Sequence, residues 1–340
     1  MSPEPARVRL RGPADVLSSL PHLLGFHPTE SLVIMCQSGP RRRQRLTIRV
    51  DLPEAADEAH TAVELTECVA REGADGVVII CYIAAPDVVG ELPGVRLVRQ
   101  LAELLADRDI EVCDAYLARG TRWWSYVCTD SRCCPHAGTE LPGEMPAAAG
   151  VLAAEAVWRG SATMPDRAAL VASIEPDPVA VAAASLAMLD EIGDSAEAQW
   201  STDASWSPAA AVELAGSLLG RYREGHPGMS GAQAARLLVG LRDVRVRDEI
   251  ATWGLNPDPE TLLALLTHLA RACPAQDAAP ACTLLAWVAY LGGNGPLANV
   301  ALDRALDAEG DYSMALLLDD ALEAQLPPAA IRQITASVCR

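Results

Sequence analysis

The chain has 340 residues, half of them hydrophobic, and this length predicts two domains because a domain typically holds about 100–200 residues. Its formal net charge of −18 at pH 7 disfavours nucleic acid and anionic membranes as partners, since a negative field repels both. The N-terminal residues contain no apolar signal core, and no apolar run reaches the roughly 20 residues of a membrane span. We therefore expect a cytoplasmic protein that does not bind membranes.

A short helix opens the patterned part of the chain. Apolar residues recur at helical spacing from Pro13 to Leu24, and Pro13 suits a first helical turn because its missing N–H is unpaired there anyway. Gly25 is placed as a helix C-cap. Pro21 predicts that the helix kinks or restarts, because proline cannot donate the backbone hydrogen bond of a helix interior.

Two strands follow this helix and predict a β-hairpin. Residues 31–36 form a continuous apolar run, which is typical of a strand covered on both faces. Residues 46–52 alternate between apolar and polar side chains, which indicates a strand with one buried face. Four arginines lie at the predicted hairpin tip, between residues 41 and 45. We interpret them as a solvated tip that protects an edge from aggregation, rather than as a site for a phosphate or a nucleic-acid backbone.

Helices and strands then alternate as far as the Cys-rich loop. The pattern predicts helices at 54–72 and 95–106, and strands at 76–84, 110–117 and 123–128. Strands joined by crossover helices imply a parallel core sheet, and hairpins add antiparallel strands. We therefore predict an α/β N-terminal domain, residues 1–146, with a mixed, mainly parallel sheet.

Helical patterns dominate the remainder of the chain. Pro and Gly separate successive Ala- and Leu-rich segments, as in a helical array. We predict an all-α helical bundle or short helical stack over residues 147–340, and all strands of consequence before Pro146.

The ten cysteines are expected to be reduced thiols in the cytosol. Cys36, Cys81 and Cys113 lie in apolar strand patterns, so we expect them to be buried and slow to alkylate. Cys128, Cys133 and Cys134 instead lie close together in a loop, and we consider them as a possible metal or thiol site.

These three cysteines are followed by a histidine, His136, within one loop. Three interpretations stay open: zinc ligation, reactive or disulfide-forming thiols, and structural packing. The spacing matches no usual zinc ligand pair, and adjacent cysteines are expected to project differently. We therefore assign no metal ligands.

A candidate ligand-binding site is placed at this loop because it joins the predicted domains, and domain junctions favour pockets. The loop follows an aromatic strand, and His27, within the turn at 25–28, is a candidate neighbour. The candidate residues are Trp123, Trp124, Tyr126, Arg132, Cys133, Cys134, His136 and His27. The sequence contains no Walker-type, G-x-S-x-G or H-E-x-x-H motif, and it identifies no cofactor.

Three strings, PADVLSSLPHLLGFHPTESLV, WWSYVCTDSRCCP and AWVAYLGGNGPLANVALDRALD, span nearly the whole chain. They resemble an uncharacterised actinobacterial family that is catalogued only as a domain of unknown function. The resemblance therefore implies no activity, cofactor or site residue. Our leading hypothesis is a non-enzymatic cytosolic binding or regulatory protein, whose partner is a protein or a small molecule. The alternative is an enzyme, or a thiol or metal site, at the Cys-rich loop near the turn at 25–28.

Overall fold

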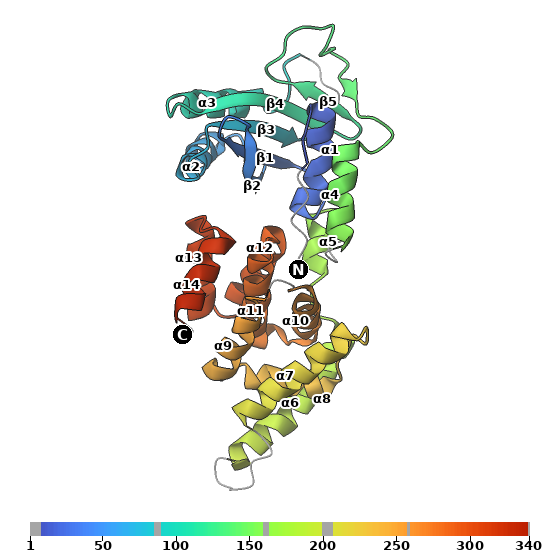
Figure 1. The fold of residues 1–340 in the computed structure, drawn as a ribbon, viewed down its shortest axis with the longest axis vertical. Helices are drawn as coiled ribbons and strands as arrows, with labels where there is room; N and C mark the ends of the chain where they lie inside the picture. Colours follow the sequence, from blue (N-terminus) through green and yellow to red (C-terminus); the bar gives the residue numbers. More distant parts are fainter. Residues whose placement is uncertain (1–7, 85–89, 159–162, 199–206, 257–258, 339–340) are drawn as a thin grey trace. The chain divides into compact units, whose positions relative to one another are not determined.

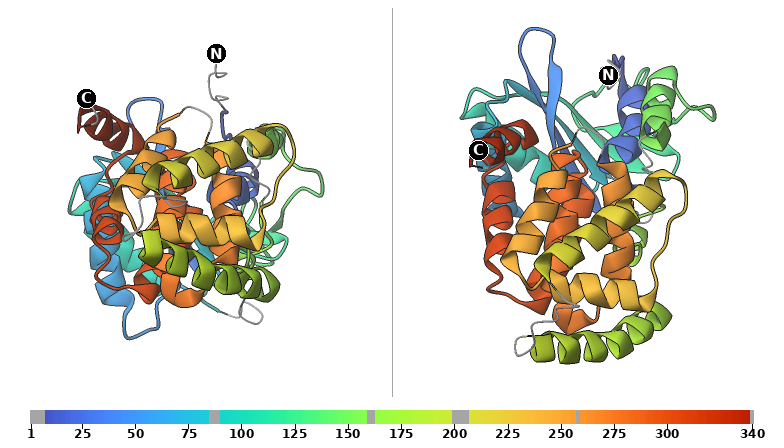
Figure 2. Two further views of the ribbon diagram at one scale, coloured as in Figure 1. Left: turned by 90° about the horizontal axis from the view of Figure 1, so that it is seen from below. Right: turned by 60° about the horizontal axis from the view of Figure 1, so that its bottom comes forward.

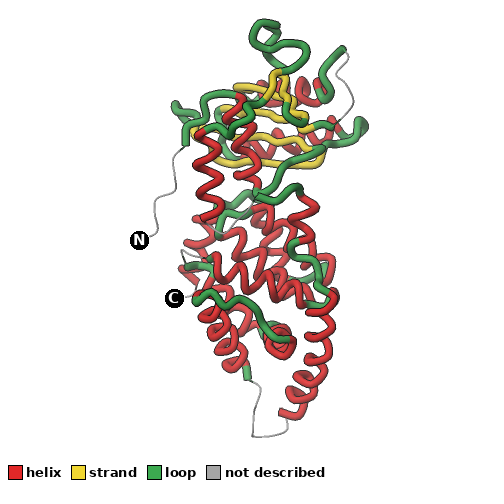
Figure 3. The backbone as a smooth tube through the Cα atoms, turned by 90° about the vertical axis from the view of Figure 1, so that its right-hand side faces the viewer, coloured by secondary structure: helices red, strands yellow, loops and turns green. Residues whose placement is uncertain are grey.

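The computed structural model describes residues 8–84, 90–158, 163–198, 207–256 and 259–338. The chain divides into two compact units, Pro5–Asp166 and Arg167–Arg340 (Figure 1). Among the described residues, every named strand belongs to the first unit, as Figure 3 shows in yellow. The units divide later in the chain than Pro146, because helix α4 packs against α1 of the first unit.

The first unit is built on a six-stranded mixed sheet, in the order β2-β1-β3-β4-β5-β6. Its strands are β1 (Ser31–Ser38), β2 (Arg43–Asp51), β3 (Gly76–Tyr82), β4 (Glu111–Arg119), β5 (Arg122–Ser125) and β6 (Thr139–Glu140). Only β3 and β4 pair in parallel; the other four pairs are antiparallel. The prediction of a mainly parallel sheet is therefore wrong.

The position of β1 explains this difference. Helix α2 (Glu58–Arg71) crosses from β2 to β3, and these two strands run in the same direction, as a crossover requires. However, β1 lies between them and is antiparallel to both. The sequence pattern gives the direction of strands joined by a helix, but it does not tell whether a third strand separates them.

Helices α2 and α3 (Val95–Ala106) cover one face of the sheet. Alternate residues of β1, β3 and β4 face these helices, while β1 and β3 are buried along almost their whole length. The prediction that the continuous apolar runs form buried strands is thus confirmed. The principal side chains of this core are Leu32, Ile34, Val77, Ile79, Leu117, Leu65, Val69, Leu97, Leu101 and Leu105.

Helix α1 (Pro13–Leu24) is one continuous helix that contains Pro21, so the predicted restart does not occur, and the kink stays a prediction. Pro21 lies near the C-terminal end of the helix. The backbone hydrogen bond that proline cannot donate is therefore followed by few further helical hydrogen bonds. Gly25 ends the helix in the left-handed conformation, with φ 75°. Phe26, the next residue, is buried.

A bulge in β4 places one cysteine differently from the prediction. Cys36 and Cys81 are buried, as expected, but Cys113 is only half-buried. The register between β3 and β4 shifts at this point, because Val112 pairs with Val77 and the next pair is formed by Asp114. A bulge residue is unpaired and its side chain is re-aimed, and the thiol of Cys113 lies against the guanidinium of Arg42.

The second unit consists of helices in its described residues. They are α5 (Arg167–Ala172), α6 (Pro178–Ala198), α7 (Pro208–Arg223), α8 (Gly231–Gly240), α9 (Val244–Trp253), α10 (Glu260–Ala272), η1 (Ala275–Asp277), α11 (Ala278–Leu291), α12 (Gly295–Ala308), α13 (Ser313–Glu323) and α14 (Pro328–Val338); α4 (Ala147–Trp158) belongs to the first unit. Helix α11 is apolar on nearly all sides and packs among α9, α10, α12, α13 and α14 (Figure 2). The predicted helical array is confirmed. No helix in the described ranges has the length and apolarity to cross a membrane.

Candidate functional site

A cavity of about 700 Å³ lies beside β5 and the loop that follows it. It is lined by Gly90, Leu92, Trp123, Trp124, Ser125, Cys128, Thr129, Cys134, Pro135, His136 and Thr139. Four of the predicted site residues, two tryptophans, one cysteine and one histidine, therefore meet at this cavity. The three hydroxyl-bearing residues of the lining were not predicted. The wall formed by Gly90 and Leu92 was not predicted either, because no local sequence pattern links these residues to the Cys-rich loop.

The two tryptophans of β5 are fixed by different neighbours. Trp123 meets Tyr116 of β4 edge to face, with ring centroids 5.5 Å apart. Trp124 packs on the side of the sheet that α2 and α3 cover, and its Nε1 donates a hydrogen bond to the carbonyl of His136 over 3.0 Å. Alternate side chains of a strand point to opposite faces, so the two tryptophans that line the cavity belong to opposite faces of the sheet.

Hydrogen bonds from β5 also fix the return of the loop toward β6. The guanidinium of Arg122 donates to the carbonyls of Ala137 and Gly138 at 3.1 and 3.2 Å. Gly138 has a φ of 76°, and a Cβ there would lie less than 3.0 Å from three atoms of the indole of Trp124. Only glycine satisfies both requirements without strain, so this glycine lets the loop close over the tryptophan.

Tyr126 was predicted to wall the cavity, but it has a different position. Its ring packs against the core, and its hydroxyl donates a hydrogen bond to the carbonyl of Pro93. Burial, followed by the neighbouring Cys81, raises the pKa of this hydroxyl. Because Gly90 and Leu92 line the cavity, Tyr126 positions the segment that forms the opposite wall.

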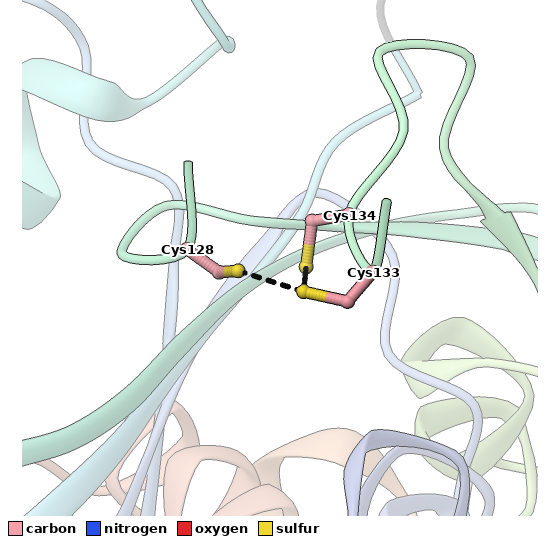
Figure 4. A group of neighbouring side chains, drawn as sticks. All are labelled: Cys128, Cys133 and Cys134. Carbon is pink, nitrogen blue, oxygen red and sulfur yellow. Dashed lines mark hydrogen bonds between the residues drawn. The ribbon is translucent and has the colours of Figure 1, made fainter. Parts of the chain in front are cut away.

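The three thiols of the loop converge at the edge of the cavity. The sulfur of Cys133 lies 3.1 Å from that of Cys128 and 3.8 Å from that of Cys134. All three ligand atoms lie within 4.8 Å of one another, and Figure 4 shows them pointing toward a common centre. The expectation that the adjacent cysteines project differently is wrong. This is the one group of three or more potential metal-ligating side chains found among the described residues.

The backbone turn between Asp130 and Cys134 explains the convergence. The amides of Cys133 and Cys134 both donate to the carbonyl of Asp130, at 3.1 and 2.8 Å. The carboxylate of Asp130 accepts hydrogen bonds from the amide and guanidinium of Arg132, which lowers the pKa of Asp130. Arg132 is therefore occupied within the turn and does not line the cavity, contrary to its predicted role.

The thiols differ in acidity. A hydrogen bond from Cys133 lowers the pKa of Cys128, because it stabilises the thiolate. Loss of solvation, together with bonds to the other two thiols, raises the pKa of Cys134 to about 12.

His27 is not among the residues that line the cavity. Its side chain is exposed, and its amide donates to the carbonyl of Met164 over 3.1 Å, next to the bridge between Phe26 and Met164. His136 does line the cavity, but no hydrogen bond in the described part of the chain joins its ring to a thiol.

The fold and the site together define a two-unit protein. Its mixed α/β unit carries a thiol cluster beside an aromatic cavity, and its other unit is helical. The chain belongs to the family described as Domain of unknown function (DUF4192), whose model matches residues 13–329. Comparison with curated proteins and with solved structures found no match.

Proposed function

We propose that the chain is a non-enzymatic cytoplasmic binding or regulatory protein, and that its first unit captures a small molecule in the cavity beside β5. The observation that carries this proposal is a cavity of about 700 Å³ with two tryptophans in its wall. Volumes of about 300–1,000 Å³, with aromatic walls and a few polar groups, are typical of ligand sites.

The lining indicates the chemistry of the ligand. Among its described residues there is no carboxylate and no guanidinium, and the polar groups are hydroxyls, thiols and one imidazole. A charged ligand would lose its hydration there without an ionic partner, which is costly. We therefore expect an uncharged, planar molecule that packs against Trp123 or Trp124 and donates or accepts hydrogen bonds at the rim.

The helical unit is proposed to provide the contact with a protein partner. Residues 167–340 hold 22 acids and 11 arginines, so the unit attracts basic surfaces and repels acidic ones. Ligand capture in one unit and protein contact in the other would make the chain a regulatory protein.

The alternative of a thiol enzyme has one observation in its favour, the lowered pKa of Cys128 beside the cavity. Cysteine hydrolases of the Cys–His type activate the thiol with a general base within hydrogen-bond reach. In the described residues no such bond from His136 reaches a thiol, so the binding function is better supported. Substrate turnover that disappears on Cys128→Ser would favour the enzyme instead.

The proposed function is tested with the full chain and a library of uncharged planar aromatic compounds, read by tryptophan fluorescence and native mass spectrometry. Trp123→Ala should weaken the binding of a captured compound at least about 10-fold, because a tryptophan anchor contributes roughly 2 kcal/mol or more. Trp253→Ala is the matched control, since Trp253 is also half-buried but lies in α9. Equal loss in both variants, or no capture by the wild type, would contradict the proposal.

A further inference from the structure

We infer that Cys128, Cys133 and Cys134 form a binding site for a single thiophilic metal ion of the zinc class, at the edge of the cavity. The inference rests on the proposed function in one respect only: a molecule in the cavity could reach the open coordination position of the ion. The site itself depends on the sulfurs and the turn that carries them.

The spacing of the sulfurs fits one ion. Zinc–sulfur bonds of about 2.3 Å in tetrahedral geometry place neighbouring sulfurs about 3.8 Å apart. The sulfur of Cys133 is 3.1 and 3.8 Å from the other two, and all three lie within 4.8 Å. Their side chains enter from two backbone segments and point to a shared centre (Figure 4). A small adjustment of side-chain torsions would equalise the distances.

Structural packing does not explain this cluster. Cysteines that pack as small hydrophobes are buried, as Cys36 and Cys81 are in the same unit. In contrast, Cys133 is exposed, and Cys128 and Cys134 are only half-buried. Three thiols in mutual contact at the surface contribute little apolar burial, so their convergence calls for another cause.

The turn is organised independently of the sulfurs. Two amides converge on the carbonyl of Asp130, its carboxylate binds Arg132, and the amide of Cys128 donates to the hydroxyl of Ser125 over 3.0 Å. A loop fixed in this way loses little entropy when an ion binds, which favours affinity. Asp130 acts as a positioning residue for two of the ligands.

The chemistry needs no redox partner. Each of the three S–H groups gives its proton to solvent as a sulfur–metal bond forms, and no electron is transferred. Thiolate ligands favour Zn²⁺ and Cu⁺ over the hard cations. Three protein ligands leave a fourth tetrahedral position of Zn²⁺ open to water. Cys128 and Cys134 line the cavity, so that position is accessible to a molecule in the cavity.

The experiment uses the full chain, purified with a non-thiol reductant and stripped of metal. Zn²⁺ is titrated against a chromophoric chelator, and Co²⁺ is added separately so that sulfur-to-cobalt charge-transfer absorption reports the thiolates. We expect one ion per chain, and a charge-transfer band that falls by about a third with each single Cys→Ser change at the cluster. Zinc affinity should fall at least about 10-fold in each variant, because even outer-shell losses cost about 10–100-fold.

Two further variants make the result decisive. Cys68→Ser is the matched control, since Cys68 is a half-buried thiol on α2 outside the cluster, and it should bind zinc like the wild type. Asp130→Ala should weaken zinc binding while circular dichroism and the melting curve stay close to the wild type. Zinc binding that survives replacement of all three cysteines overturns the inference, as does a reduced chain that binds no metal.

An intramolecular disulfide between Cys128 and Cys133, formed in air and unaffected by prior zinc loading, would also overturn the metal site. None of these measurements includes an organic compound. A chain that captures a planar compound but no zinc therefore disproves only the metal site. A chain that binds zinc but no compound disproves only the proposed function.

Discussion

The indole of Trp124 lies directly against Gly138, so close that a Cβ on residue 138 would come within 3.0 Å of three atoms of the ring system. The same indole donates a hydrogen bond to the carbonyl of His136. The Cys-rich loop is therefore closed around a tryptophan of β5. The closure depends on the smallest side chain at the point of contact.

Gly138→Ala should lower the free energy of unfolding by about 1–3 kcal/mol, because the new methyl group overpacks the site and residue 138 has a positive φ. The measurement is urea denaturation of the full chain. Gly120→Ala is the matched control, since Gly120 also has a positive φ but no neighbouring atom within 4 Å of the point that a Cβ would occupy. Equal losses in the two variants would show that backbone strain alone matters, and that the contact with Trp124 does not.

Tyr126→Phe should destabilise the chain by about 1 kcal/mol, because it removes a buried hydrogen bond to the carbonyl of Pro93. The amides at the start of α3 should exchange faster with deuterium, since the hydroxyl holds the segment before that helix. Tyr82→Phe provides the contrast. The hydroxyl of Tyr82 is buried without a hydrogen-bond partner in the described residues, so its removal should be neutral or stabilising. A larger loss of stability in Tyr82→Phe than in Tyr126→Phe would contradict this view.

Pulse labelling with iodoacetamide, followed by peptide mass spectrometry, should divide the cysteines of the first unit by burial. Cys36 and Cys81 should react slowest, because burial blocks access and raises the pKa of both thiols to about 12. Cys113 should react faster than these two, since the bulge leaves it half-buried. Labelling of Cys36 or Cys81 at the rate of Cys113 in the native chain would refute the assignment of β1 and β3 as buried strands.

Alkaline pH should destabilise the folded state through the same buried thiols. Loss of solvation raises the pKa of Cys81 from 9.0 to about 12. The stability that this protonated thiol provides is complete below pH 9, and it is lost as the pH rises toward 12, because the unfolded chain ionises first. Cys81→Ala should reduce the slope of unfolding free energy against pH by about 1.4 kcal/mol per pH unit in this range. Urea curves at several pH values test it, and an unchanged slope would contradict the burial of the thiol.

Arg304 in α12 connects two other segments of the helical unit. Its guanidinium donates to the carbonyl of Ile174 and, over 3.2 Å, to that of Cys273. Arg304→Met should cost about 2–3 kcal/mol, since hydrogen bonds from charged groups are stronger than neutral ones and two carbonyls lose a donor. Arg167→Met should cost less than about 1 kcal/mol, because its ion pair with Asp303 is exposed. Thermal melting of both variants measures the two losses of stability. A loss in Arg167→Met as large as that in Arg304→Met would contradict the prediction.

Much of the fold follows from side-chain periodicity, and the exceptions have identifiable causes. The apolar runs of β1 and β3, the amphipathic α3 and the helical array are all visible as patterns. The parallel sheet was predicted wrongly, because the insertion of β1 between β2 and β3 is a tertiary choice. β6 was missed since two residues, Thr139 and Glu140, cannot display a period.

The candidate site was predicted in part because the aromatic strand and the Cys-rich loop are adjacent in sequence. Trp123, Trp124, Cys134 and His136 meet at the cavity as expected. The facing of Cys133 and Cys134 toward Cys128 was not predictable, because it depends on the hydrogen bonds of one turn. Gly90 and Leu92 join the site only through the fold.

The cavity lies beside the strands at one edge of the sheet, where local opening costs the least free energy. β5 and β6 are the strands furthest from the β1–β2 hairpin, and β6 is paired through only two residues. Short edge elements open locally without unfolding the core. A compound or ion bound there would slow the exchange of amides in β5 and the Cys-rich loop, while β1 and β3 keep their own rates. Binding of a compound or ion would then change the mobility of this edge of the sheet, while the mobility of the buried strands β1 and β3 stays the same.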